Sequence, residues 1–274
     1  MSSNLQHIVD MLLLNGTLIE CPGLVYGKLG IAVFFFHHAQ YTGNELFADY
    51  AMDLIEEMQK QIHVNSPADY GRGIAGIGVG LYFLIRNNFL NSEDDIFEDL
   101  DKRMYRAVMY DPWLDFSLYS GLTGYGQYWM MRLQQKDSSV QAQKCLMRIV
   151  GWIEEKLSDI SAKEQTDVYC FLHDLCQIQD FDMCADLLEK LKIQSADFSR
   201  LGNSIVGNFL RMYQRHHYFN DTLHSEIDIA LKQIPDLNME KPPVSMGLLT
   251  GYAGEGMIRL TVLNQTDISW MQLL

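Results

Sequence analysis

One short glycine motif recurs along the chain and constrains its fold more than any other feature. In each copy a small residue is followed three positions later by glycine, and an apolar run comes next. The copies lie at residues 27–30, 73–76, 121–124, 204–207 and 251–254. Their last glycines are about 47 residues apart, except for one gap of 83 that is close to two units. A period of this size is typical of a repeat architecture.

The segments between the motifs alternate between two kinds of predicted helix. Residues 31–36 are apolar on all sides, as expected of a buried helix, whereas residues 44–62 combine an apolar stripe with a charged face. The same alternation recurs to the end of the chain, with a degenerate apolar segment at 167–176. We therefore predict an all-α fold of about six helical hairpins. They would form an α/α toroid in which apolar helices make an inner ring, as a single domain over residues 1–274.

Composition excludes several classes of partner. The formal charge of −14 argues against nucleic acid and against an anionic membrane surface, because both are bound by clustered Lys and Arg. Five cysteines without a framework spacing favour a reducing compartment. The first residues lack the basic region and cleavage site of a signal peptide, and the apolar run at 74–85 is too short to span a bilayer. We expect a cytoplasmic protein.

Polar residues cluster just ahead of the predicted inner helices. In a toroid they would meet at one rim, where they could bind a peptide or a small ligand. Carboxylates there could also act as acid and base on a sugar, although capping of helix N-termini is the more ordinary role of Asp and Ser. The rim candidates are Tyr26, Lys28, Asp69, Tyr70, Arg72, Asp111, Asp115, Tyr119 and Ser245.

The repeated turns of the form Ser/Tyr-x-Gly-x-x-Gly-Ile/Tyr resemble those of the lanthionine synthetase C-like (LanC-like) family. That resemblance implies an α/α toroid that cyclises dehydrated peptides by adding a cysteine thiol to a dehydroamino acid. It also implies a zinc ion held by two cysteines and a histidine. With Gly207 as register, the family's Cys-His-Gly falls on Gly202, Asn203 and Ser204, and the chain contains no Cys-Tyr-Gly. The chain therefore resembles a member of this family that lacks the zinc ligands.

One other group of residues could bind a metal. Cys170, His173 and Cys176 are spaced by three residues, which spreads them over roughly 120° of a helix. This is not a usual zinc-binding spacing, and Cys and His are common in protein cores. We favour the core interpretation, so no cofactor is expected and zinc is the less favoured alternative.

These observations predict a LanC-like protein that lacks the zinc site. It would act as a peptide-binding or accessory component of a peptide-modification pathway of the lanthipeptide type, with a peptide substrate or a protein of that pathway as partner. Two alternatives remain. The first is a metal-independent toroid enzyme that acts on a carbohydrate or cyclises a peptide, and the second is a purely structural interaction partner.

Overall fold

The computed structural model describes residues 2–91, 96–113, 115–135, 139–178, 182–200, 204–220, 224–237, 243, 245–264 and 268–274. These residues are helical or irregular, with a single isolated bridge between Ser245 and Gly251, which confirms the all-α prediction. The chain divides into two compact units. Unit 1 comprises Met1–Asn65 and Phe198–Leu274, and unit 2 comprises Ser66–Asp197. The closed ring and the single domain stay predictions.

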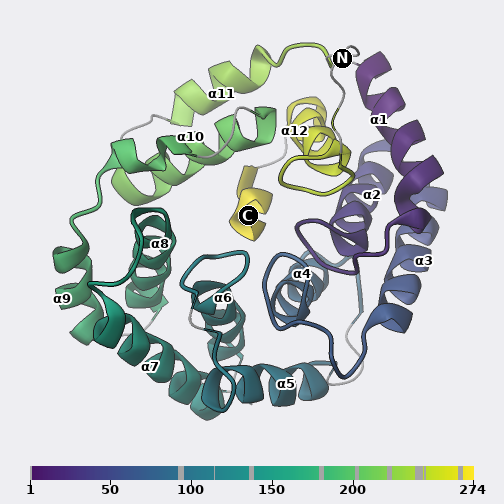
Figure 1. Cartoon of the computed structure of the whole chain (residues 1–274). Coiled ribbons are helices and arrows are strands. Elements are labelled where there is room, and N and C mark those ends of the chain that lie inside the picture. Colours follow the sequence, from purple (N-terminus) through teal and green to yellow (C-terminus); the bar gives the residue numbers. More distant parts are fainter. Residues whose placement is uncertain are drawn as a thin grey trace. The chain divides into compact units, whose positions relative to one another are not determined.

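Unit 2 contains two rows of helices (Figure 1). The apolar row consists of α4 (Ile74–Arg86), α6 (Leu122–Leu133) and α8 (Ala162–Ile178), and α6 packs against both of its neighbours. The amphipathic row consists of α5 (Glu98–Met109), α7 (Ser139–Lys156) and α9 (Asp182–Leu191), each packed against the apolar helix before it. The hairpins predicted from the sequence are therefore present in this unit.

Unit 1 repeats the arrangement with both ends of the chain. Its apolar row is α10 (Ile205–Phe219), α12 (Tyr252–Asn264) and α2 (Lys28–Thr42). Helix α3 (Leu46–Gln61) packs against α2, and α11 (His224–Lys232) packs against α10. The helix that covers α12 is α1 (Ser2–Asn15), from the opposite end of the chain (Figure 1). The last hairpin is thus assembled from the N-terminal and C-terminal segments.

Short 3₁₀ helices complete unit 1: η1 (Gly16–Leu18), η3 (Ser195–Arg200, which begins in unit 2) and η4 (Ile268–Leu273). The η4 segment is held to α12 by a 3.0 Å hydrogen bond that the Trp270 indole donates to the Thr261 hydroxyl. Among the described helices, none combines the length and the apolar character needed to cross a membrane.

The glycine turns share one backbone geometry. The N–H of the first residue of each helix reaches back seven residues to a carbonyl, at 2.9 Å for Lys28 to Cys21, 2.9 Å for Ile74 to Pro67 and 2.7 Å for Leu122 to Asp115. Tyr252 repeats the bond to Ser245 at 3.0 Å. The glycine before each helix faces that same carbonyl, and φ lies between −133° and −112° at Gly27, Gly73 and Gly121. Close backbone approach, rather than a positive φ, is therefore the reason for glycine here.

A second set of glycines sets the distance between apolar helices. A Cβ on Gly78 would collide with the Tyr128 ring of the next apolar helix, and a Cβ on Gly126 would collide with the Phe171 ring. Gly256 faces Phe34 in the same way in unit 1. Each aromatic ring thus fills the space that a missing side chain leaves on its neighbour.

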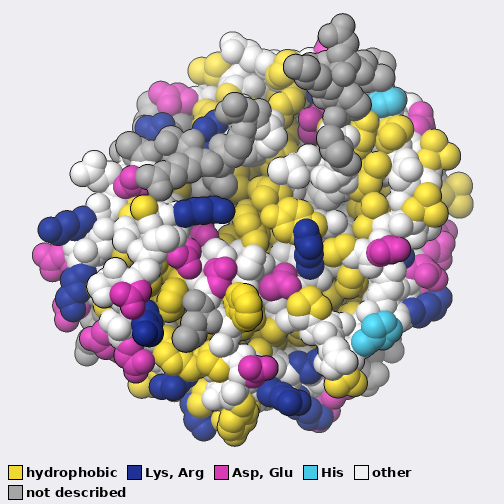
Figure 2. All heavy atoms as spheres, viewed as in Figure 1, with side chains coloured by type: hydrophobic (Ala, Val, Ile, Leu, Met, Phe, Trp, Pro, Cys, Tyr) yellow, Lys and Arg dark blue, Asp and Glu magenta, His cyan; other side chains and the backbone are white. Residues whose placement is uncertain are grey.

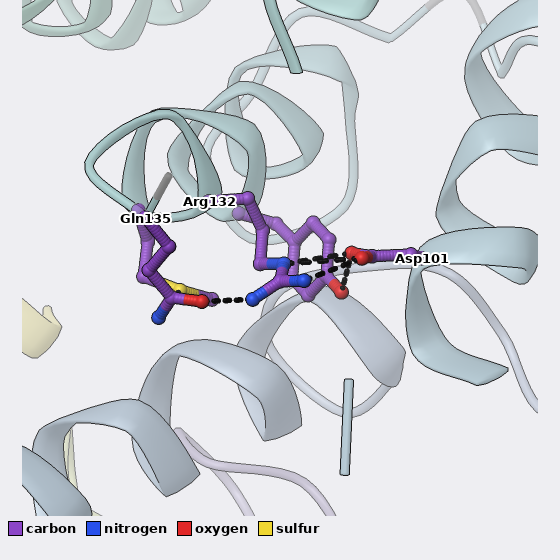
Figure 3. Close-up of polar contacts among 5 residues, drawn as sticks. Asp101, Arg132 and Gln135 are labelled. Atoms are coloured by element: carbon purple, nitrogen blue, oxygen red, sulfur yellow. Dashed lines mark hydrogen bonds and ion pairs between the residues drawn. The ribbon is translucent and has the colours of Figure 1, made fainter. Parts of the chain in front are cut away.

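A buried ion pair joins α5 to α6 in unit 2 (Figure 3). Arg132 donates from Nε to Asp101 Oδ1 at 2.9 Å and from Nη2 to Asp101 Oδ2 at 2.6 Å. Tyr128 donates its hydroxyl to Asp101 at 2.6 Å, and Gln135 accepts from Arg132 Nη1. Arg132 is only 4% exposed, so this bidentate pair lies inside the unit.

Candidate functional site

The predicted rim residues fall in two groups, one in each unit. Unit 1 contains Tyr26, Lys28 and Ser245, and unit 2 contains the others. Lys28 is 2% exposed at the start of α2, in contrast to the expectation of a rim side chain. The Ser245 hydroxyl lies 3.3 Å from that of Thr250 within the same glycine turn. Tyr26 is half-buried. In unit 1 the described contacts of Ser245 therefore serve the turn itself.

In unit 2 the turns before α4 and α6 lie side by side. Gly71 N–H donates to the Tyr119 carbonyl at 2.9 Å. Asp69 Oδ1 accepts from the Arg72 backbone N–H at 2.7 Å, and Asp115 Oδ1 accepts from the Ser117 backbone N–H at 2.7 Å and from its hydroxyl. One oxygen of each carboxylate therefore holds a turn, which is close to the capping role that the sequence favours.

Tyr70 does not lie with these carboxylates at the surface. Its side chain is 2% exposed, and burial raises the pKa of its phenol. Its Cβ lies in the space that a side chain on Gly124 would need. Tyr70 is thus a core residue of unit 2, which corrects its assignment to an exposed rim.

Helix α8 adds two carboxylates that sequence reasoning missed. Glu164 Oε1 accepts from the Phe116 N–H at 3.0 Å, and Asp167 Oδ2 accepts from the Leu118 N–H at 2.9 Å. Both N–H groups belong to the turn before α6. Phe171 matches Tyr128 in its contact with the preceding helix, so Asp167 stands four residues earlier, at the place of Gly124. Because no glycine turn marks this register in the sequence, both residues are found only from the packing of Phe171 in the structure.

Burial of Asp167 perturbs its protonation. The pKa of this carboxyl is raised to about 6, mainly by desolvation and to a smaller extent by the charges of Asp115 and Glu164. The Leu118 N–H and Lys163 act in the opposite direction. Asp167, which contacts the turn before α6, is therefore a carboxyl group that changes its charge near neutral pH.

Replacing Asp167 with Asn is expected to stabilise the protein at pH 7.5 but not at pH 4. Because folding raises the pKa of Asp167, the protonated carboxyl favours the folded state. This contribution to stability is complete below pH 3.8 and is lost as the pH rises through about 6. The ionised side chain then costs about 2–3 kcal/mol at pH 7.5, and Asn avoids this cost while still accepting from Leu118. Urea unfolding at both pH values measures the difference. Glu154→Gln, which removes an exposed charge from α7, should leave the wild-type values nearly unchanged.

Tyr125, in the first turn of α6, faces the same carboxylates. The pKa of its phenol is raised to about 12, mainly by desolvation and to a smaller extent by the charges of Asp69, Asp111 and Asp115. The side chain is 5% exposed. The phenol therefore stays protonated at neutral pH, beside a group of negative charges from two adjacent turns.

The possible metal ligands do not form a site with a thiol. Cys170, His173 and Cys176 lie on α8 as the sequence predicts. Within the described ranges, no group of three potential ligands with atoms within 4.8 Å of one another includes a cysteine. His173 Nδ1 instead lies 3.6 Å from the carboxylate of its neighbour Asp174. The cysteine-containing set does not fit the thiolate-rich zinc site that the family resemblance implies.

The position of the family's Cys-His-Gly is only partly visible. Gly202 and Asn203 lie outside the described residues. Ser204 is the N-cap of α10, and its hydroxyl accepts from the Gly207 N–H at 3.0 Å. This serine therefore has a structural role in starting the helix.

Comparisons with known proteins give no further identification: no protein-family model matches the chain, and no curated protein matches it.

Proposed function

We propose that this protein is a LanC-like protein without the family's zinc ligands, and that it binds peptides as an accessory component of a peptide-modification pathway. The repeated glycine turns support the family, because four of them share one backbone hydrogen-bond geometry. The observation that carries the loss of zinc chemistry is Ser204. It occupies part of the Cys-His-Gly position and caps α10 there.

The site in unit 2 supports binding rather than acid–base catalysis. A glycosidase needs two carboxyl groups with free faces directed at the substrate. Asp69, Asp115 and Asp167 instead each accept a backbone N–H, and Glu164 accepts two. These bonds fix the carboxylates as a rigid negative group, which suits the recognition of a ligand.

Zinc analysis tests the proposal. The purified chain, loaded with excess zinc sulfate and then dialysed, is expected to retain far less than one zinc ion per chain by mass spectrometry. Over the described ranges, no group of closely spaced potential ligands includes a thiol, so the thiolate-rich ligand set of the family's zinc site is missing there. One zinc per chain that is lost in Cys170→Ser, His173→Ala or Cys176→Ser would overturn it. Cys21→Ser, in unit 1, is the matched control.

A further inference from the structure

Three exposed basic residues of the amphipathic row in unit 2 form no ion pair with a described carboxylate. They are Arg106 on α5 and Lys144 and Arg148 on α7, and these two helices pack against each other. On the same helices, Lys102 and Lys156 do form ion pairs, 2.8 and 3.9 Å from a carboxylate oxygen. In a chain with a formal charge of −14, basic side chains that no acidic neighbour neutralises are available to an acidic partner.

Aromatic rings hold the two basic side chains of α7 in place. Lys144 Nζ donates to the Tyr105 hydroxyl at 3.0 Å and lies 5.6 Å from the centre of that ring. The Arg148 guanidinium lies over the Trp152 ring, 4.4 Å from its centre. Tyr105 also makes an edge contact with the ring of Tyr110, which is 75% exposed. A cation that already rests on an aromatic face loses less conformational entropy when a partner binds it.

Exposed apolar side chains lie on the same face of α7. Val140 is 80% exposed and Met147 is 54% exposed, and Lys144 lies between them at helical spacing. Gly151 follows Met147 by one turn, and nothing would come within 4 Å of a Cβ there, so the helix backbone is open to a partner. Figure 2 shows basic side chains next to apolar ones at the lower edge of the view, where Figure 1 draws α5 and α7. This pattern complements a helix with one apolar and one acidic side.

The chemistry of this surface favours an acidic polypeptide over a nucleic acid. Nucleic acid is bound through a continuous row of cations along its phosphates. The row on α7 stops at Arg148, because the exposed Glu154 and Glu155 follow it. Val140 and Met147 also offer apolar area, which a partner with apolar side chains can bury and a phosphate backbone cannot.

We propose that Arg106, Lys144 and Arg148, together with Val140 and Met147, form a docking surface of unit 2 for an acidic amphipathic helix of a partner protein. The apolar side of that helix covers Val140 and Met147, and its carboxylates pair with the three cations. The surface belongs to the amphipathic row and uses no residue of the glycine turns. The inference therefore goes beyond the proposed binding of peptides and does not depend on it.

Fluorescence anisotropy of dye-labelled peptides, titrated with the full chain, tests the docking surface. The acidic probe contains the repeat Leu-Glu-Glu-Ala-Leu-Glu-Glu twice, the basic probe has Lys in place of every Glu, and a scrambled acidic probe lacks the helical spacing of Leu. The acidic probe is expected to bind at least about tenfold more tightly than the other two, with an affinity that falls as salt is added. Non-specific attraction to a chain of charge −14 would favour the basic probe instead.

Two variants locate the binding on α7. Lys144→Gln combined with Arg148→Gln should weaken binding of the acidic probe about tenfold, and Met147→Ser about three- to tenfold. All three side chains are exposed, so these variants are expected to fold as the wild type does. Lys156→Gln, which removes the same charge from the end of α7, is the matched control and should leave the affinity unchanged.

Several results would overturn the docking surface. They are absence of binding by the acidic probe, equal binding of the acidic and scrambled probes, and an affinity that neither variant changes. A thymidine oligonucleotide that binds more tightly than the acidic probe, and loses affinity in the double variant, would identify a nucleic-acid surface instead. None of these results bears on the zinc analysis, which tests the proposed function separately.

Discussion

Replacing Gly254 with alanine is expected to prevent the chain from folding stably. Gly254 lies in the first turn of α12, and a Cβ there would come far closer than 3.0 Å to the backbone carbonyl of Leu248. The carbonyl belongs to the glycine turn, which cannot move without losing the bond from the Leu248 N–H to Val25. We expect a loss of stability of about 4 kcal/mol or more, among the largest effects of single substitutions.

Gly151→Ala is the matched control. Gly151 lies within α7, and nothing would come within 4 Å of an added Cβ. Alanine should stabilise this helix by about 0.5–1 kcal/mol, because glycine loses more backbone entropy on folding. Urea unfolding followed by circular dichroism measures both variants. If Gly254→Ala unfolded at the wild-type urea concentration, the close backbone approach would not be the reason for the repeated glycines.

Replacing Arg132 with methionine is expected to destabilise the protein by about 3–5 kcal/mol. The substitution keeps the apolar bulk but leaves Asp101, which is 8% exposed, without its bidentate partner. Tyr128 would then be the only side chain that still donates to this carboxylate within the described contacts. An unpaired charge in the core costs more than the pair contributes.

A combined variant separates this cost from lost packing. Asp101→Leu, Tyr128→Phe and Arg132→Met together remove the charges and the hydroxyl that they hold. We expect this variant to recover most of the stability that Arg132→Met loses, because an apolar replacement of a whole buried pair is often neutral or stabilising. Lys102→Met, which breaks an exposed pair with Glu98, should have little effect on urea unfolding. Equal losses in the single and combined variants would mean that packing, rather than charge, explains the effect.

The helices could be predicted from the sequence because local signals coincide in them. The turn glycines mark where α2, α4, α6 and α12 begin, and the apolar composition of α2 and α4 distinguishes them from the amphipathic α3 and α5 that follow. The pairing of α1 with α12 could not be predicted in this way. It joins segments more than 230 residues apart, and hydrophobic periodicity says that a helix has a partner without saying which one.

The candidate site was predicted less well, because turn glycines locate a turn but not the direction of its side chains. Asp69 and Asp115 were found from their place before an apolar helix, and their turn-holding bonds agree with that place. Tyr70 has the same sequence context but points into the core. Asp167 was missed because α8 begins at Ala162 without a glycine turn, so its position emerges only from the packing of Phe171 on Gly126.

Peptide cyclisation in the presence of zinc tests the central claim most directly. The substrate is a synthetic peptide with one dehydroalanine and one cysteine, incubated with the purified chain and zinc sulfate. Cyclisation forms a carbon–sulfur bond and moves the thiol proton to carbon without changing the mass, so the remaining thiol is counted by alkylation and mass spectrometry. We predict that the thiol stays open to alkylation, as in the protein-free control. A zinc-dependent loss of the thiol that occurs only with the protein would contradict the account.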